Sequence, residues 1–268
     1  MPIKIEDDAS YHAGEGVSKS GLWTLWSKTP FHYRYGVRES RPQFDVGKAA
    51  HIAILEPERL ETSITRGPVD RRGNKWKEAQ DFAEFHKTIL LTEGDFEQVM
   101  LIRDLAATSS ILDTMRDGGA IVETSAYHVD EETGVLVKTR PDMYNPKHKI
   151  ICDIKNMADG SAGAFSRDVA KFGYHVQETM YSDVWEKGSG NEVEAFVFVV
   201  FEKSEPPMLA AYELDSDAAK EGHAIYRAAL AKYAECLKAD NWPGYPDEVQ
   251  RIGLRSKWDF KMVEPEGE

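Results

Sequence analysis

The sequence predicts an α/β fold in which a central mixed β-sheet is flanked by helices and preceded by a mainly helical N-terminal segment. Helical patterns fill most of residues 1–115, whereas runs rich in β-branched residues begin near residue 120. Residues 195–201 are apolar without alternation, as expected of a strand that is covered on both faces. Since 268 residues can bury one large core, we expect a single domain made of a helical part (1–115), a core (116–240) and a C-terminal tail (241–268).

The starts and ends of the helices follow from residues that favour caps or forbid helical backbone. Ser18 or Ser20 can cap the first helix, and Pro30 interrupts it before an aromatic stretch at residues 31–35. A later helical pattern breaks near Ser109. The remaining predicted helices span residues 44–55, 74–87, 93–115, 174–185 and 216–238.

The predicted strands include a hairpin that carries charged residues. The strand candidates are residues 120–129, 135–143, 149–155 and 194–202, and a turn at residues 145–148 joins the middle two. Because side chains alternate along a strand, Asp153 and Lys155 should lie on one face, about 7 Å apart. The turn can bring Asp142 back beside them.

Two carboxylates and a lysine at the ends of adjacent strands are typical of a magnesium-dependent phosphodiesterase. An acid and a lysine that face a core are costly unless each has a partner, and a divalent cation with a phosphate supplies such partners. The alternative is a solvated strand face with one ordinary ion pair. Spacing alone favours that alternative, because short motifs often match by accident.

Several motifs of the chain resemble those of one nuclease superfamily. Pro141-Asp142 followed by Asp153-Ile154-Lys155 resembles the signature of the PD-(D/E)xK nucleases. Further matches resemble the RecE-type phage exonucleases, which are exonuclease VIII-like, and they occur in order along the chain. These matches are residues 17–20 with 29–30, residues 47–51 with 55–58, residues 71–77, and residues 174–177 with Tyr181. The ordered set is far more specific than any one motif.

The resemblance implies a PD-(D/E)xK core with a metal site on the predicted hairpin. Asp142 and Asp153 would hold Mg²⁺, with the carbonyl oxygen of Ile154 as a third ligand, and Mn²⁺ is expected to substitute. Mg²⁺ prefers oxygen ligands and keeps several waters, which suits this partial shell. Lys155 would orient the attacking water or neutralise charge on the phosphate. Asn156-Met157 replaces the two threonines of many relatives, so a hydroxyl contact to DNA or to a second metal is not expected.

The resemblance also implies supporting residues around this site. Glu123 would line the site and help to bind a second ion, although an exposed strand position explains it nearly as well. His51 would reach the metal, whereas a lone histidine on a helix is more often a hydrogen-bonded core residue. Gln177 and Tyr181 would brace the site or contact DNA, and a buried amide at position 177 needs partners.

Two segments are candidates for DNA contact. Ser18, Lys19 and Ser20 lie at a predicted helix start, which could hold a terminal phosphate, and plain N-capping is the alternative. Residues 66–77 carry five cations against one acid, which suits contact with a DNA backbone. The candidates in this loop are Arg71, Arg72, Lys75 and Trp76, of which Trp76 can stack on a base. An ordinary solvated loop is the alternative, and the net charge of −13 taken alone argues against a nucleic-acid partner.

The activity implied by the resemblance is ATP-independent exonuclease action on double-stranded DNA ends. It implies 5′-to-3′ degradation that leaves 3′ overhangs for a RecT-type annealing protein, and a ring-shaped homo-oligomer encoded by a phage or prophage. The chain has no glycine-rich lysine loop of the NTPase kind, so no nucleotide cofactor is expected. Another nuclease of the superfamily, such as a single-strand or structure-specific endonuclease, and a catalytically silent DNA-binding module are the alternatives.

The composition is that of a soluble intracellular enzyme, and the resemblance to phage exonucleases implies the cytoplasm of a bacterial host cell. No apolar run approaches about 18 residues and no basic segment precedes an apolar one, so we expect neither a membrane span nor a secretory signal. Cys152 and Cys236 are expected to be reduced core residues, and two thiols cannot hold a four-cysteine iron–sulfur cluster.

Overall fold

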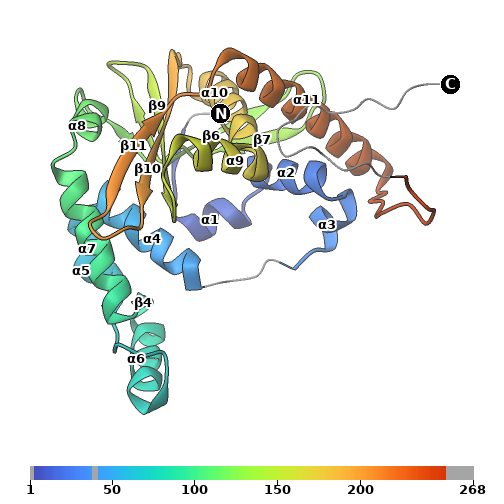
Figure 1. The fold of residues 1–268 in the computed structure, drawn as a ribbon. Coiled ribbons are helices and arrows are strands. Elements are labelled where there is room, and N and C mark those ends of the chain that lie inside the picture. Colours follow the sequence, from blue (N-terminus) through green and yellow to red (C-terminus); the bar gives the residue numbers. More distant parts are fainter. Residues whose placement is uncertain (1–2, 38–41, 252–268) are drawn as a thin grey trace.

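The computed structural model describes residues 3–37 and 42–251 and has helices on both faces of a central sheet (Figure 1). The mixed α/β fold class predicted from the sequence is confirmed. The predicted C-terminal tail has no helix or strand in residues 241–251, and residues 252–268 lie outside the described part. Within the described ranges, no helix combines the length and the apolar character needed to cross a bilayer.

The central sheet has five strands in the order β11-β10-β9-β8-β5. β9 and β10 run parallel, whereas the other neighbouring pairs run antiparallel, so the sheet is mixed as predicted. Its strands are β5 (Ile121–Val122), β8 (Met143–Asn145), β9 (Ile150–Met157), β10 (Ala195–Glu202) and β11 (Met208–Tyr212).

Alternation along β9 divides the core into two layers. Cys152 and Ile154 pack against one set of helices, while Ile151 packs against another set on the opposite face. The first set is α4 (Pro42–Leu55), α7 (Glu93–Ala107) and α8 (Ser110–Arg116), and the second is α9 (Ala162–Phe172) and α10 (Tyr174–Ser189). Both faces of the sheet are therefore buried, as the apolar sequence of β10 requires. Since α4 packs on the central sheet, the N-terminal helical part and the core share one hydrophobic interior.

A smaller sheet extends the fold toward α11, with strands in the order β1-β6-β7-β2. These strands are β1 (Lys4–Ile5), β2 (Val17–Ser18), β6 (Thr124–Val129) and β7 (Leu136–Thr139). Val17 and Val137 from this sheet share a core with Val176 of α10 and Tyr226 of α11 (Ser216–Ala239). Leu22 of α2 (Lys19–Ser27) completes this core, so α10 contacts both sheets.

The remaining elements lie before and around α4. They are α1 (Asp8–Ala13), α3 (Pro30–Tyr35), a 3₁₀ turn (Pro57–Arg59), α5 (Leu60–Ser63), α6 (Gly73–His86) and the paired strands β3 (Ile64–Arg66) and β4 (Ile89–Leu91). The aromatic stretch thus forms α3, because Thr29 caps it and Pro30 suits its first turn. α6 lies at the end of the molecule remote from α11 (Figure 1).

Two of the predicted strands each divide between the two sheets. The first is divided between β5 and β6 at Glu123, whose φ of +46° turns the chain. The second is divided between β7 and β8 at residues 140–142, where Pro141 has no N–H to donate to a ladder. The Glu123 N–H donates to the Asp142 carbonyl over 3.1 Å, so the two crossings lie side by side. The predicted hairpin therefore consists of β8 and β9 alone.

Candidate active site

The candidate site forms where these two crossings meet β9. Asp142 is buried, and its Oδ2 accepts a hydrogen bond from the backbone N–H of Ile154 over 2.6 Å. The Pro-Asp motif is thereby fixed against the Asp-x-Lys strand. The sequence-based expectation that the turn returns Asp142 to this strand is met.

Three side chains offer ligand atoms to a single point. One atom each from His51, Glu123 and Asp142 lie within 4.8 Å of one another. The His51 Nδ1 lies 3.6 Å from Asp142 Oδ1, and its Nε2 lies 3.2 Å from the carbonyl oxygen of Ile154. Together these groups form a compact set of oxygen and imidazole donors.

The electrostatics of this cluster favour a cation. Burial, with the charge of Asp142 nearby, raises the pKa of Glu123 to about 8. Burial likewise raises the pKa of Asp142 above its ordinary value. Because a bound divalent ion would remove the cost of keeping both carboxylates charged, the donor set fits Mg²⁺ or Mn²⁺.

Asp153 and Lys155 form a second group on the α10 side of β9. The two side chains make an ion pair, and both are largely buried. Burial opposes the charge of Lys155, but Asp153 outweighs it and keeps the pKa of Lys155 above its ordinary value. Gln177 donates from Nε2 to Asp153 and accepts from the Lys155 ammonium over 3.3 Å. Gln177 thus holds both groups, as its buried position in α10 demands.

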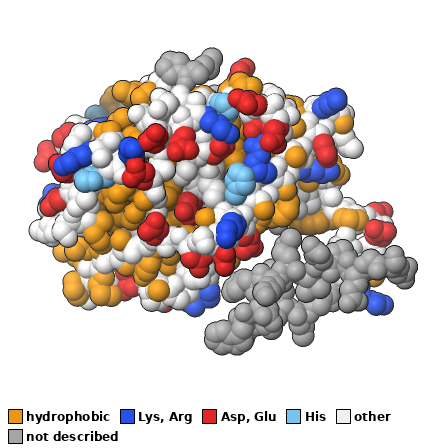
Figure 2. Space-filling view, turned by 90° about the horizontal axis from the view of Figure 1, so that it is seen from above, with side chains coloured by type: hydrophobic (Ala, Val, Ile, Leu, Met, Phe, Trp, Pro, Cys, Tyr) orange, Lys and Arg blue, Asp and Glu red, His pale blue; other side chains and the backbone are white. Residues whose placement is uncertain are grey.

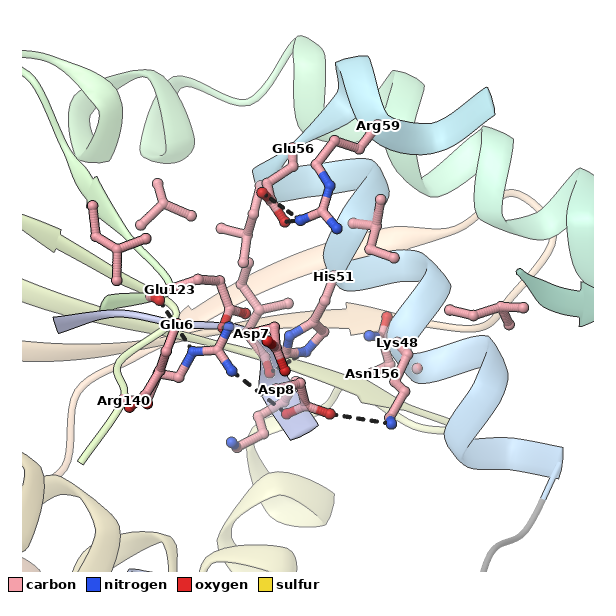
Figure 3. A pocket seen from close by; sticks show the side chains of 18 of the residues that line it. Glu6, Asp7, Asp8, Lys48, His51, Glu56, Arg59, Glu123, Arg140 and Asn156 are labelled. Carbon is pink, nitrogen blue, oxygen red and sulfur yellow. Dashed lines mark hydrogen bonds and ion pairs between the residues drawn. The ribbon is translucent and has the colours of Figure 1, made fainter. Parts of the chain in front are cut away.

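Members of both groups border one open cavity of about 910 Å³ (Figure 3). His51, Glu123, Lys155 and Tyr174 are among its lining residues. The ring of Tyr174 lies 4.6 Å from the Lys155 ammonium, which limits where that ammonium can move. The site is therefore accessible to a substrate while its charged groups keep fixed positions.

The segment from Ser18 to Ser20 forms the start of α2, as the sequence predicted, but the side chain of Lys19 is buried. Ser18 occupies the N-cap of α2 without a side-chain cap hydrogen bond, and its Oγ lies 3.1 Å from that of Ser20. The Lys19 side chain is buried and donates to the carbonyl of Phe172 over 2.6 Å. Burial, reinforced by nearby Lys155, lowers the pKa of Lys19 to about 7. Lys19 thus lies behind the site, and its contact with DNA stays a prediction.

Residues of the predicted basic loop line a second cavity, which lies beside the first. Arg71 pairs with Asp95 over 3.0 Å and stacks over Trp76, while Arg72 and Lys75 are exposed. Arg71 and Trp76 line a cavity of about 530 Å³, and Lys48 borders both cavities. The loop is therefore connected to the site by α4.

Tyr181 lies on the core side of α10. Its ring packs edge-on against Phe196 at 6.4 Å between centroids, and burial raises its pKa well above the ordinary range. This position suits a brace for the site better than a contact with DNA.

Three residues that line the cavity were not predicted from the sequence to have a role in the site. Arg140 donates to the backbone of Glu123 and forms an ion pair with its carboxylate at 2.9 Å. Lys48 lies one turn before His51 on the same face of α4, which helical spacing could have revealed. Asp8 comes from the distant N-terminal segment, and no local pattern marked it.

The surface does not compensate for the acidic composition with one large basic patch on the face seen from above. Acidic and basic side chains are interspersed there (Figure 2). On this face, attraction for a polyanion would therefore depend on particular cations and not on a continuous positive surface.

The chain can be compared with known proteins on this basis. The family model described as "PDDEXK-like domain of unknown function (DUF3799)" matches residues 30–254. A crystal structure described as a "Putative exonuclease" from Eubacterium rectale is similar over 94% of this chain and 97% of its own, with 14% identity and a TM-score of 0.63. A structure of the protein SSO0001 covers 75% of this chain and 89% of its own at 12% identity, but its TM-score of 0.31 supports no argument.

No curated protein matches the chain. The similarity to the Eubacterium rectale structure concerns the fold alone, because the sequences share so few residues. The family match, in contrast, covers most of the sequence, including every residue of the metal-binding cluster and of the Asp153–Lys155 pair. The chain therefore belongs to the DUF3799 family of PDDEXK-like domains, the nuclease-type fold that its motifs predict.

Proposed function

We propose that this protein is a divalent-metal-dependent deoxyribonuclease that degrades double-stranded DNA from its ends. The observation that carries the proposal is the meeting of two groups at one open cavity. One group, His51, Glu123 and Asp142, offers metal ligands, and the other is the buried Asp153–Lys155 pair. A protein without chemistry would have little reason to bury so many charges in one place.

The residues divide the work of phosphodiester hydrolysis. Asp142, His51 and the Ile154 carbonyl would hold the ion, and the motif resemblance adds Asp153 as a further ligand. Glu123 would hold the same ion or a second one. A bound Mg²⁺ supplies a more acidic water and stabilises charge on the non-bridging phosphate oxygens. Lys155 stays protonated beside Asp153 and can orient the attacking water or neutralise the developing charge.

Gln177 and Tyr174 act through Lys155. Gln177 bonds to both members of the Asp153–Lys155 pair, and the ring of Tyr174 covers the ammonium group. Preorganised charges of this kind need little rearrangement when the phosphate reacts. We assign both residues to positioning.

Action from duplex ends rests on the resemblance to RecE-type exonucleases. That resemblance supports 5′-to-3′ degradation, a ring-shaped homo-oligomer, a RecT-type annealing partner and a place in the cytoplasm of a bacterial host. The motifs of the N-terminal segment, α4, the basic loop and α10 are its sequence support.

A direct test compares linear duplex DNA with covalently closed circular DNA of the same sequence. With Mg²⁺, and without ATP, the purified protein should degrade the linear form and leave the circle intact, and a chelator should stop the reaction. Cutting of the circle would favour an endonuclease instead. No cleavage of either form, in Mg²⁺ or in Mn²⁺, would favour a silent DNA-binding module.

A further inference from the structure

The mouth of the site cavity contains a chain of charges that the proposed chemistry does not use. The Asp8 carboxylate of α1 lies 3.2 Å from the Lys48 ammonium and 3.6 Å from the Arg140 guanidinium. Arg140 in turn pairs with Glu123 of the metal-binding cluster. Figure 3 shows these four side chains in a row across the cavity. An anion therefore already lies between two cations beside the candidate metal site.

The contacts of the Asp8 carboxylate with Lys48 and Arg140 can be broken at small cost in stability. The side chains of Asp8 and Lys48 are 53% and 60% exposed, and exposed ion pairs contribute little to stability. Asp8 belongs to a helix of one and a half turns at the N-terminal end, and its neighbours Glu6 and Asp7 line the same cavity. A phosphate of a bound strand can replace such a contact at small cost.

Asn156 supplies a second, independent observation. Neither the nitrogen nor the oxygen of its side-chain amide has a hydrogen-bond partner among the described residues, and both atoms are buried. Asn156 lines the cavity, and Figure 3 shows it beside Lys48. A buried amide without partners is costly, so its presence points to a group that arrives with a ligand.

We propose that Lys48, Arg140 and Asn156 form a subsite for one backbone phosphate of the DNA strand, next to the metal site, and that Asp8 occupies its cations when no DNA is bound. This inference rests on the proposed function and names the contact through which the substrate enters. Lys48 also borders the cavity of Arg71 and Trp76, which gives the strand a route from the subsite to the basic loop. Asp8 of helix α1 thereby competes with the DNA phosphate for the cations of the subsite.

The test measures the affinity of the full-length protein for a 5′-labelled linear duplex at several salt concentrations. Ca²⁺ replaces Mg²⁺, and gel analysis verifies that the DNA stays intact. The variants are Lys48→Gln, Asp8→Asn, the double variant, and Asn156→Ala, which removes the side-chain amide. Glu235→Gln is the matched control, because it removes one exposed acid from α11, remote from the cavity.

Lys48→Gln should weaken binding about threefold to tenfold and lower the salt slope by about one, since one phosphate contact is lost. Asp8→Asn should strengthen binding by a similar factor, and most of that gain should vanish in the double variant. Asn156→Ala should weaken binding without lowering the melting temperature, because the amide has no partner among the described residues of the free protein.

The outcomes separate the subsite from the nuclease proposal. If Asp8→Asn behaves like Glu235→Gln, or if Lys48→Gln leaves the salt slope unchanged while the wild type binds DNA, the subsite is wrong and the nuclease proposal survives. If the wild type binds no duplex, both fail. A lowered melting temperature for Asn156→Ala would assign Asn156 to the core instead of the subsite.

Discussion

At the scale of single residues, the site contains several buried charged side chains. Each would be costly to bury alone, and each is stabilised here by a neighbouring partner. Asp142 is held by a backbone N–H, and Asp153 by Gln177 and Lys155. Each carboxylate thus has a protein partner that fixes its direction, and one such partner of each, Ile154 for Asp142 and Lys155 for Asp153, lines the cavity. Such arrangements are typical of metal-dependent phosphoryl chemistry.

Asp153→Ala should abolish cleavage while leaving the fold intact. Asp153 is a proposed metal ligand whose loss removes a charge and frees Gln177, without exposing the strand core. End-labelled duplex with Mg²⁺ gives the rate, and circular dichroism monitors the fold. Near-normal activity would remove Asp153 from the mechanism.

Lys155→Met should lower kcat far more than it lowers DNA affinity. The variant keeps the length of the side chain but loses the charge that we assign to the transition state. Steady-state kinetics and binding in Ca²⁺ measure the two effects, with Lys220→Met, an exposed lysine of α11, as the control. Equal losses in kcat and affinity would mean that Lys155 only binds.

Glu178, next to Gln177, predicts a pH effect on stability. Burial, with Glu213 and Asp215 nearby, raises its pKa from 4.5 to about 7, and its Oε2 has no hydrogen-bond partner among the described residues. A raised carboxyl pKa gives stability that is present below pH 4.5 and is lost as the pH rises through about 7.

Glu178→Gln cannot ionise, so its stability relative to the wild type should increase between about pH 5 and pH 8. Urea unfolding at both pH values measures this difference. A constant difference across that range would show that Glu178 ionises normally.

At the scale of elements, the site depends on two places where the chain leaves one sheet for the other. Glu123 and residues 140–142 are these crossings, and both carry site residues. β-strand patterns predicted the runs on either side but joined them, because periodicity does not reveal which sheet a strand enters. The left-handed backbone of Glu123 is a consequence of tertiary structure that no sequence pattern marked.

This crossing can be tested with two substitutions at one position. Glu123→Gly and Glu123→Ala both remove the carboxylate, but only glycine adopts the φ of +46° without strain. The glycine variant should therefore be more stable by about 1 kcal/mol in urea unfolding without metal. Both should bind Mn²⁺ more weakly in calorimetry. A glycine variant no more stable than the alanine variant would mean that the backbone is not strained there.

At the scale of the whole molecule, the sequence predicted features that depend on local spacing. It did not predict contacts between segments that are distant along the chain. The hairpin placed Asp142, Asp153 and Lys155 correctly, because alternation and a turn define their neighbourhood. Helix α4 and the apolar strand β10 were also predicted within a few residues. Asp8 contacts Arg140 across nearly half the length of the chain, a contact that no local pattern encodes.

Burial was likewise hidden from the sequence. Lys19 was predicted to lie at a helix start, and it does, but the contact of α2 with the end of α9 encloses its ammonium. The composition, with its net charge of −13, gave no hint that cations gather at the cavity mouth. Lys48 and Arg140 line the cavity beside acids such as Asp8, and the net charge cannot show this local arrangement.

We propose that the carboxylates of Asp142 and Asp153, together with His51, hold one divalent ion. A crystal grown with Mn²⁺ would show directly whether an ion lies there. We expect an anomalous peak for Mn²⁺ within about 2.0–2.3 Å of an Asp142 oxygen and of a His51 nitrogen. Asp153 or the Ile154 carbonyl should complete the protein ligands. No ion at this position, with these side chains separated, would contradict it.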